Sequence, residues 1–518
     1  MPYRPCLQTA IYFFELISWN FLYNFLNYGI RFASRIIFVK TLAEVYLGIN
    51  GLLSNVLGIL ALTELGIGTA IGYSLYEPLA KNDVEKTRSL MDFYKKAYRI
   101  ISLVILVLGL VLLPVLPYLI KDNSGINNLN VIYVIFLINM VIGYLFSYKR
   151  TLITSDQKTY KIVPFTMGFN ILTAALQIVV LLIFKNYIIY LLMQTICIVL
   201  ENVVINRYIN KEYPYLLDKT LVKPIDKEEL SVIKMKIKAL LLHKVGAYTL
   251  TSTDNLIISK LIGIVTVGVY SNYSLIVSMI AAFIYTLISN VTSSLGNLIA
   301  SENKSKRLKV FNEMNLICYI LYGVSSICLI NLFNPFIELV FGSNYVLGMF
   351  VVYVIVINHY LTGMNNTVIS IQTASGLYEK DKYVPLIQSA VNLIVSIDLG
   401  IKMGLVGIFI GTIVSTMLPL IIKPFIVYKY VFDNKVSLYF KEFMLQTGII
   451  VLSTIGSVML INVINVGNVY IDLFVRLILS VSIPLVLIYI VYRKKDSFRD
   501  LFGRVRTVLN KFVKKKGI

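Results

Sequence analysis

The sequence has few charged residues for its length. Only 14% of its 518 residues are Asp, Glu, Lys or Arg, whereas about a quarter is usual in soluble proteins. It has two histidines and four cysteines, and the cysteines form no CxxC pair. These shortages argue against a water-soluble enzyme, a zinc site and a disulfide framework. We therefore expect no catalytic residues, no metal, no cofactor and no enzymatic activity.

Long apolar runs are abundant instead. Hydrophobic residues make up 57% of the chain, and the mean hydropathy is +0.77. Runs of roughly 20 apolar residues, enough to cross about 30 Å of hydrocarbon, can be placed fourteen times. Because the runs are continuous, they predict transmembrane helices, and the expected fold class is all-α, a polytopic membrane protein of about 14 transmembrane helices. The predicted spans lie near 17–39, 48–76, 97–120, 128–148, 160–184, 187–206, 239–262, 268–297, 311–334, 345–373, 384–402, 404–428, 442–463 and 470–492.

The basic residues that give the chain its net charge of +21 are distributed according to the predicted topology. Basic residues gather in every second loop and in the tail from Arg493. The loops on the opposite side hold only Lys40, Lys121, Lys185, Lys260 and Lys402. This positive-inside bias predicts that both termini are cytoplasmic. The basic surplus therefore indicates membrane topology, and we expect no nucleic-acid partner.

The spans suggest two related halves. A shift of the chain by 220 residues brings Lys40 onto Lys260, Gly48 onto Gly268 and Ser54 onto Ser274. Six spans in each half make the repeat parallel, and transporters built this way bind substrate between their halves. The predicted parts are a first six-helix lobe (1–213), an amphipathic linker (214–238), a second six-helix lobe (239–430), accessory helices 13 and 14 (431–492) and a basic tail (493–518).

The linker and the tail are amphipathic. In the linker, Asp226 to Glu229 resemble a capping box that opens a helix. In the tail, Phe498, Leu501 and Phe502 begin an apolar stripe at helical spacing, opposite a basic face. Such a helix binds anionic membrane lipids, which we expect as partners.

Two stretches resemble a known family. EVYLGINGLLSNVLGILALTELGIGTAIGYSLYEPLAKNDVEKTRSLMDFYKKAYRI (44–100) resembles the first quarter of bacterial polysaccharide repeat-unit (Wzx-type) flippases, in the multidrug/oligosaccharidyl-lipid/polysaccharide (MOP) exporter superfamily. DNLIISKLIGIVTVGVYSNYSLIV (254–277) resembles the seventh and eighth spans of the same family. The resemblance implies twelve core helices in two lobes and a place in the bacterial cytoplasmic (inner) membrane.

The resemblance also implies a function. The family moves undecaprenyl-pyrophosphate-linked oligosaccharide from the inner to the outer leaflet for capsule, O-antigen or exopolysaccharide synthesis. Polysaccharide polymerase or assembly proteins are candidate partners, and Na⁺, H⁺ or the membrane potential could drive transport. A related lipid II or teichoic-acid-type flippase and a MATE-like cation-coupled drug antiporter remain alternatives. A polymerase or glycosyltransferase is disfavoured, because the outward loops are short.

Ionisable residues inside predicted spans are the candidate substrate-binding residues, because burying them in lipid is costly. Arg31 and Arg35 lie four apart on one face of the first helix and suit a pyrophosphate headgroup; lipid snorkelling or pairing with an acid is the alternative. Glu64 is either their counter-charge or a cation site, and Asp254 is the better candidate for a coupling ion. His359 could contact sugar hydroxyls or be a satisfied core histidine.

Overall fold

The computed structural model describes residues 27–64, 66–121, 128–226, 253–292, 301–464 and 467–501, with single positions between these ranges. Every regular element in this part of the chain is a helix. Eleven of these helices are long and apolar enough to cross a membrane. The chain is thus an all-α, multi-pass membrane protein, and the predicted fold class is confirmed.

The eleven helices coincide with eleven of the fourteen predicted spans. The tenth predicted span is α12 (Met349–Ala374), a 26-residue helix that is more polar because it carries His359 and several asparagines. The first and seventh spans are helical where they are described, over 27–41 and 253–261, and their remaining residues lie outside the described part of the chain.

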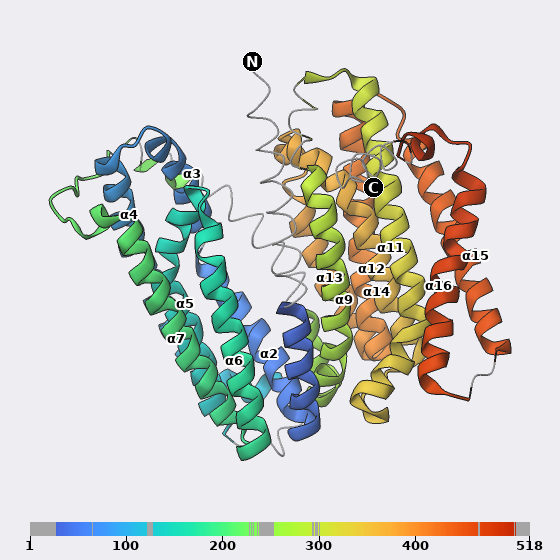
Figure 1. The fold of residues 1–518 in the computed structure, drawn as a ribbon, viewed down its shortest axis with the longest axis horizontal. Helices are drawn as coiled ribbons and strands as arrows, with labels where there is room; N and C mark the ends of the chain where they lie inside the picture. Colours follow the sequence, from blue (N-terminus) through green and yellow to red (C-terminus); the bar gives the residue numbers. More distant parts are fainter. Residues whose placement is uncertain are drawn as a thin grey trace, which may run out of the picture. The chain divides into compact units, whose positions relative to one another are not determined.

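The chain divides into two compact units, Met1–Ser271 and Asn272–Ile518. In the first unit, α4 packs on α5, and α7 packs on both α5 and α6 (Figure 1). They are α2 (Glu44–Leu60), α3 (Ile67–Ala80), α4 (Val84–Leu112), α5 (Leu129–Ser155), α6 (Val163–Phe184) and α7 (Tyr187–Glu212). The helix at 253–261 and the first turns of α9 (Ile264–Thr292) also belong to this unit.

The second unit is a bundle in which α11 contacts α12, α15 and α16, while α14 packs on α12 and α13. Small residues allow the α13–α14 contact, since a Cβ atom on Gly407 would lie 2.0 Å from the Leu399 carbonyl oxygen. The bundle helices, besides α12, are α11 (Lys304–Phe341), α13 (Val384–Met403), α14 (Leu405–Val427), α15 (Ser437–Val463) and α16 (Val469–Tyr492).

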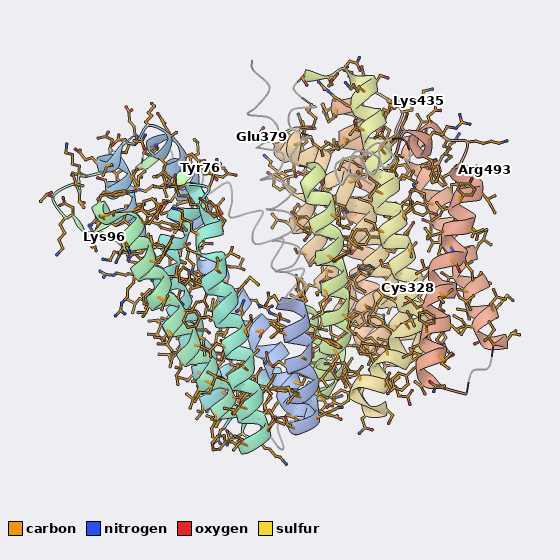
Figure 2. All side chains as sticks on the ribbon, in the orientation of Figure 1. Tyr76, Lys96, Cys328, Glu379, Lys435 and Arg493 are labelled. Carbon is orange, nitrogen blue, oxygen red and sulfur yellow. The ribbon has the colours of Figure 1, made fainter. Side chains whose placement is uncertain are left out.

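Charged side chains gather at the helix ends of each unit. Figure 2 shows Glu379, Lys435 and Arg493 at one end of the second unit, whereas Cys328 lies midway along its helices. The first unit has Tyr76 and Lys96 toward one of its own ends (Figure 2). This distribution is typical of membrane helices whose charged residues stay in the headgroup layers.

Several helices extend beyond the predicted spans. Helix α4 begins at Val84, well before residue 97, and α5 continues to Ser155, so Lys149 and Arg150 lie in a helix and not in a loop as predicted. The predicted ends were placed where apolar residues stop. A helix can continue past that point because its charged side chains reach the headgroups and water.

The second predicted span, 48–76, is not one continuous helix. Helix α2 ends at Leu60, a 3₁₀ turn follows at η1 (Ala61–Glu64), and α3 begins after Gly66. Gly66 has φ +77°, a left-handed conformation that glycine adopts at little cost. The break in the second span therefore lies at this glycine.

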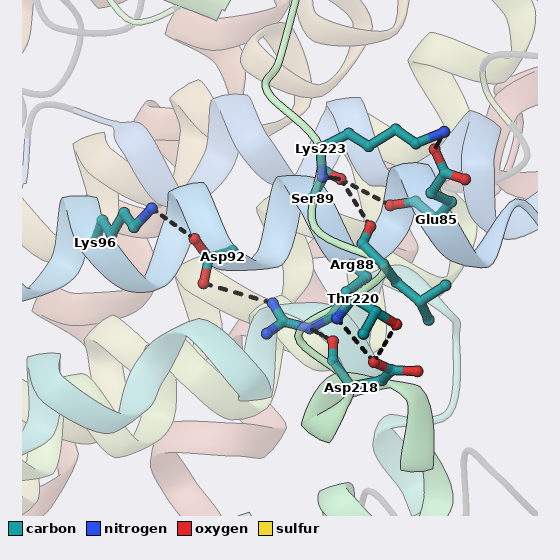
Figure 3. A network of polar contacts seen from close by, with 9 residues as sticks. Glu85, Arg88, Ser89, Asp92, Lys96, Asp218, Thr220 and Lys223 are labelled. Carbon is teal, nitrogen blue, oxygen red and sulfur yellow. Dashed lines mark hydrogen bonds and ion pairs between the residues drawn. The ribbon is translucent and has the colours of Figure 1, made fainter.

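The segment after α7 docks on α4. Figure 3 shows Arg88 of α4 donating from Nε to the Asp218 carbonyl oxygen at 3.0 Å, while the Lys223 N–H donates to the Ser89 hydroxyl at 2.9 Å. Hydrogen bonds from the Thr220 side chain and backbone hold the pKa of Asp218 below its ordinary value. Residues 218–223 are thus fixed to the first unit, and the Leu230 N–H bonds the Asp226 carbonyl where the predicted linker helix begins.

The start of the tail packs on protein. Phe498 and Leu501, the first residues of the predicted lipid-facing stripe, pack against a buried cluster of the second unit. Lys309 of α11 forms an ion pair with Asp500 at 2.7 Å. Most of the predicted tail helix, from 504 onward, lies outside the described residues.

Two glycines at the predicted repeat interval meet within the first unit. A Cβ atom on Gly48 of α2 would lie 1.9 Å from the Ile264 carbonyl oxygen, and one on Gly268 of α9 would lie 2.9 Å from the Gly48 nitrogen. These glycines are 220 residues apart. Equivalent residues that meet one another are typical of a two-fold axis, as in an isologous contact. The crossing thus brings together two residues that the predicted repeat makes equivalent, and the repeat itself stays a prediction.

We expect Gly48→Ala to destabilise the protein by about 1–3 kcal/mol or to prevent folding, because its methyl group would overlap backbone atoms. Gly143→Ala is the matched control, since a Cβ atom there meets nothing within 4 Å. Thermal unfolding in detergent and the monodisperse yield on size-exclusion chromatography measure the difference. Equal stability of the two variants would contradict the close crossing.

Candidate functional site

The two predicted arginines lie on the described helix 27–41. Arg31 is exposed and Arg35 is half-buried, one turn further along. The Arg35 guanidinium donates a hydrogen bond to the hydroxyl of Ser271, the last residue of the first unit. The Ser271 hydroxyl is a neutral partner, and the guanidinium that it contacts is a group that binds anions in a bidentate manner.

Aromatic rings lie one turn beyond Arg35. Phe38 is buried, and its ring centroid lies 5.7 Å from that of Tyr187 and 5.3 Å from that of Tyr190, both in α7. Tyr46 of α2 packs on Tyr187 at 4.9 Å. These edge and tilted contacts fix the arginine helix against α2 and α7. The sequence alone could not select these tyrosines, because the chain has 36.

Glu64 ends the 3₁₀ turn where the second span breaks, and its side chain is 8% exposed. Its carboxylate accepts hydrogen bonds from the Gly68 N–H at 2.7 Å and from the Tyr98 hydroxyl at 2.8 Å. Glu64 therefore caps the first turn of α3, where backbone N–H groups have no helical partner. Its predicted pairing with the arginines and its predicted cation site stay predictions.

A half-buried charge pair in the first unit was not predicted. Arg150 of α5 donates to Glu201 of α7 at 2.8 Å and to the Asn202 side chain at 3.3 Å. Arg150 had been assigned to a loop. The acid Glu201 inside the predicted span 187–206 was the signal that could have revealed its partner. The pair links α5 to α7 and lets both charges remain in an apolar environment.

The remaining predicted residues lie in different units. Asp254 is half-buried in the helix 253–261 of the first unit. His359 belongs to α12 of the second unit and is 5% exposed. A hydrogen bond of 3.1 Å joins its Nε2 atom to the Ser325 hydroxyl, and its ring packs on Tyr322 at 5.1 Å. His359 thus has the surroundings of a satisfied core histidine.

Polar residues near His359 also bond to one another. Asn366 donates to the Tyr322 hydroxyl at 2.9 Å, and Thr416 of α14 donates to the Asn358 side chain at 2.9 Å. Such bonds hold membrane helices together. In the part of the chain that the structure describes, no group of three His, Cys, Asp or Glu side chains is placed to hold a metal ion.

The fold is similar to that of several solved transporters, one of which is described as a member of the MOP superfamily. The inward closed lipid II flippase MurJ superposes with a TM-score of 0.67 at 14% identity, over 92% of this chain and 99% of that one. An inward-facing multidrug resistance MATE family transporter of the MOP superfamily superposes with a TM-score of 0.56 at 16% identity, over 77% of this chain and 92% of that one. The Vibrio cholerae MATE transporter VcmN superposes with a TM-score of 0.56 at 12% identity, over 81% of this chain and 97% of that one. No family model and no curated protein matches the sequence.

These solved structures are transporters and a flippase, and the present chain shares their fold. Sequence identities of 12–16% establish the fold alone. The MurJ likeness covers more of this chain than either MATE likeness does.

Tyr98→Phe should destabilise the protein by about 2 kcal/mol, because it removes a hydrogen bond to a buried carboxylate. Tyr133→Phe is the matched control, since it removes a bond of 2.8 Å to the neutral Gly109 carbonyl and should cost about 1 kcal/mol. Thermal unfolding compares the two variants. In a Glu64→Gln background the cost of Tyr98→Phe should shrink, and an unchanged cost would argue against the Tyr98–Glu64 bond.

Proposed function

We propose that this protein is a Wzx-type flippase for undecaprenyl-pyrophosphate-linked oligosaccharide in the bacterial cytoplasmic membrane, with both termini in the cytoplasm. Its product would be a lipid-linked repeat unit in the outer leaflet, ready for capsule, O-antigen or exopolysaccharide assembly. The observation that carries the proposal is the half-buried Arg35, held by the neutral hydroxyl of Ser271 in a MOP-type fold.

The chemistry of the headgroup explains why arginine matters. A pyrophosphate is permanently anionic and needs donors that stay ionised inside the membrane, and a guanidinium binds its oxygens in a bidentate manner. Arg31, exposed one turn away, supplies a second guanidinium on the same helix. The polyprenyl tail would remain in lipid while the headgroup crosses by alternating access.

Two other transport functions fit the same fold. A lipid II-type substrate is supported by the likeness to MurJ, which covers 92% of this chain. A lipid II substrate also carries an anionic headgroup, so binding of purified carriers would separate the two flippase functions. A MATE-like drug antiporter would instead depend on acidic residues for its cationic cargo, so dye efflux that is lost in Asp254→Asn and kept in Arg35→Gln would favour it.

We expect Arg35→Gln to reduce flipping of a fluorescent undecaprenyl-pyrophosphate oligosaccharide in reconstituted vesicles by about tenfold or more, the loss typical of a charge-assisted hydrogen bond. Arg35→Lys should retain part of the activity, because it keeps the charge and loses the bidentate geometry.

The matched control removes a different membrane guanidinium. Arg476 of α16 pairs with Asp472 at 2.7 Å, so the double variant Arg476→Gln, Asp472→Asn deletes an arginine without leaving a lone acid. It should flip at the unaltered rate. Equal rates for Arg35→Gln and the unaltered protein would refute the cationic site.

The membrane potential is the proposed driving force. An anion carried outward from a negative interior gains about 2.3 kcal/mol per charge per 100 mV. In vesicles, a potassium diffusion potential of the physiological sign should therefore raise the initial outward rate. If the initial flipping rate does not change with the membrane potential, and flipping stops when no Na⁺ or pH gradient is present, transport is coupled to an ion instead.

A further inference from the structure

The second unit contains a polar cavity that the proposed transport does not use. It has a volume of about 270 Å³ and lies among α11, η7 (Tyr428–Phe432), α15, α16 and the start of the tail. None of the five predicted substrate-binding residues lines it. Its volume is just below the roughly 300–1,000 Å³ that is usual for ligand sites, which suits a small molecule.

Two buried polar atoms in the cavity wall have no hydrogen-bond partner among the described residues. They are the side-chain oxygen of Asn315, a residue that is 4% exposed, and the hydroxyl of Tyr439, a residue that is 2% exposed. The Asn315 amide nitrogen already donates to Gln446 at 3.4 Å. A buried polar atom without a hydrogen-bond partner destabilises the folded protein, so native proteins contain few of them. These two atoms therefore indicate that a polar ligand binds in the cavity.

The charges in the wall cancel. Lys495 contacts both oxygens of Glu442, at 2.7 and 2.9 Å, and the Tyr492 hydroxyl donates to the same carboxylate. A free anion or a free cation would therefore gain no net attraction from this ion pair. The remaining wall groups are the Asn312 and Gln446 amides and aromatic rings that include Phe311. Amides, a paired carboxylate and aromatic faces together suit an uncharged group that has both hydroxyls and C–H faces.

A second cavity adjoins the first one on its outer side. This second cavity, of about 430 Å³, shares Leu308, Asn312 and Ser497 with it. The outer cavity is lined by two cations and two acids, among them Lys309 and Asp500, which form an ion pair that ties the tail to α11. A ligand can therefore approach past the tail without meeting a net charge.

We propose that the inner cavity binds an uncharged, hydroxyl-rich group of monosaccharide size, either a soluble sugar or the sugar headgroup of a glycolipid. Asn315 and Tyr439 supply the hydrogen bonds, and the ring of Phe311 supplies an apolar face. This site lies wholly within the second unit and is independent of the arginines that carry the proposed transport.

Titration calorimetry on the full chain in nanodiscs tests the site. The nanodiscs contain no glycolipid, and no maltoside or glucoside detergent is used, because either would occupy the cavity. The soluble probes are methyl α-D-glucoside and N-acetylglucosamine, with inorganic phosphate as the charged control. We expect a glycoside to bind in roughly the millimolar range, as is usual for small neutral ligands, and phosphate not to bind.

A separate experiment tests whether the natural ligand is the headgroup of a glycolipid. Nanodiscs that contain a monoglucosyl diacylglycerol should raise the unfolding temperature and compete with the soluble glycoside if a headgroup is the natural ligand. A soluble glycoside that binds while the glycolipid has no effect assigns the site to a free sugar. Absence of binding by all of these probes means that only water fills the cavity, and the proposal is then wrong.

Variants locate the binding. Tyr439→Phe removes only an unpaired hydroxyl, so it should fold and should weaken glycoside binding by about tenfold. Tyr319→Phe is the matched control, because its buried hydroxyl is also unpaired but does not line the cavity. Asn312→Ala, at an exposed position of the wall, should weaken binding as well.

Arg35→Gln separates this site from the transport site. It should leave glycoside binding unchanged even where it abolishes flipping. If Tyr439→Phe and Tyr319→Phe bind the glycoside equally well, or if Arg35→Gln alone removes binding, the sugar occupies a different site and the proposal fails.

Discussion

The close crossing of α2 and α9 at Gly48 and Gly268 constrains much of the first unit. Any side chain at Gly48 would collide with a backbone carbonyl, so the two helices approach as closely as their backbones allow. The same crossing sets the start of α9 beside α2, which is where Ser271 reaches Arg35. The position of the Arg35 guanidinium thus depends on a backbone contact between helices at two glycines, which have no side chain that could bind a substrate.

Hydrogen bonds between small polar side chains join the other helices. Asn331 of α11 donates to Ser457 of α15 at 2.9 Å and to Ser480 of α16 at 2.8 Å. Lipid offers no hydrophobic driving force between apolar helices, so such bonds and close packing supply the attachment. This explains why an accessory pair of strongly apolar helices stays fixed to α11.

The sequence predicted the helices better than the site. Composition located the spans because lipid demands long apolar runs, whereas the close contact of Gly48 with Gly268 was not predicted, although the 220-residue shift aligns these two glycines. The Arg150–Glu201 pair was missed because helices continue beyond the apolar runs. The inner cavity of the second unit could not be predicted at all, since Asn315 and Tyr439 come together only through the packing of α11 on α15.

Helix α11 is 38 residues long. At 1.5 Å per residue it extends about 57 Å, nearly twice the thickness of the hydrocarbon layer. Its first three turns are the polar ones and carry Lys304, Lys306, Arg307 and Lys309. These turns must therefore stand among phosphates and water, and Lys309 pairs there with Asp500. A water-soluble molecule and a molecule anchored in the lipid leaflet can therefore both reach these turns of α11.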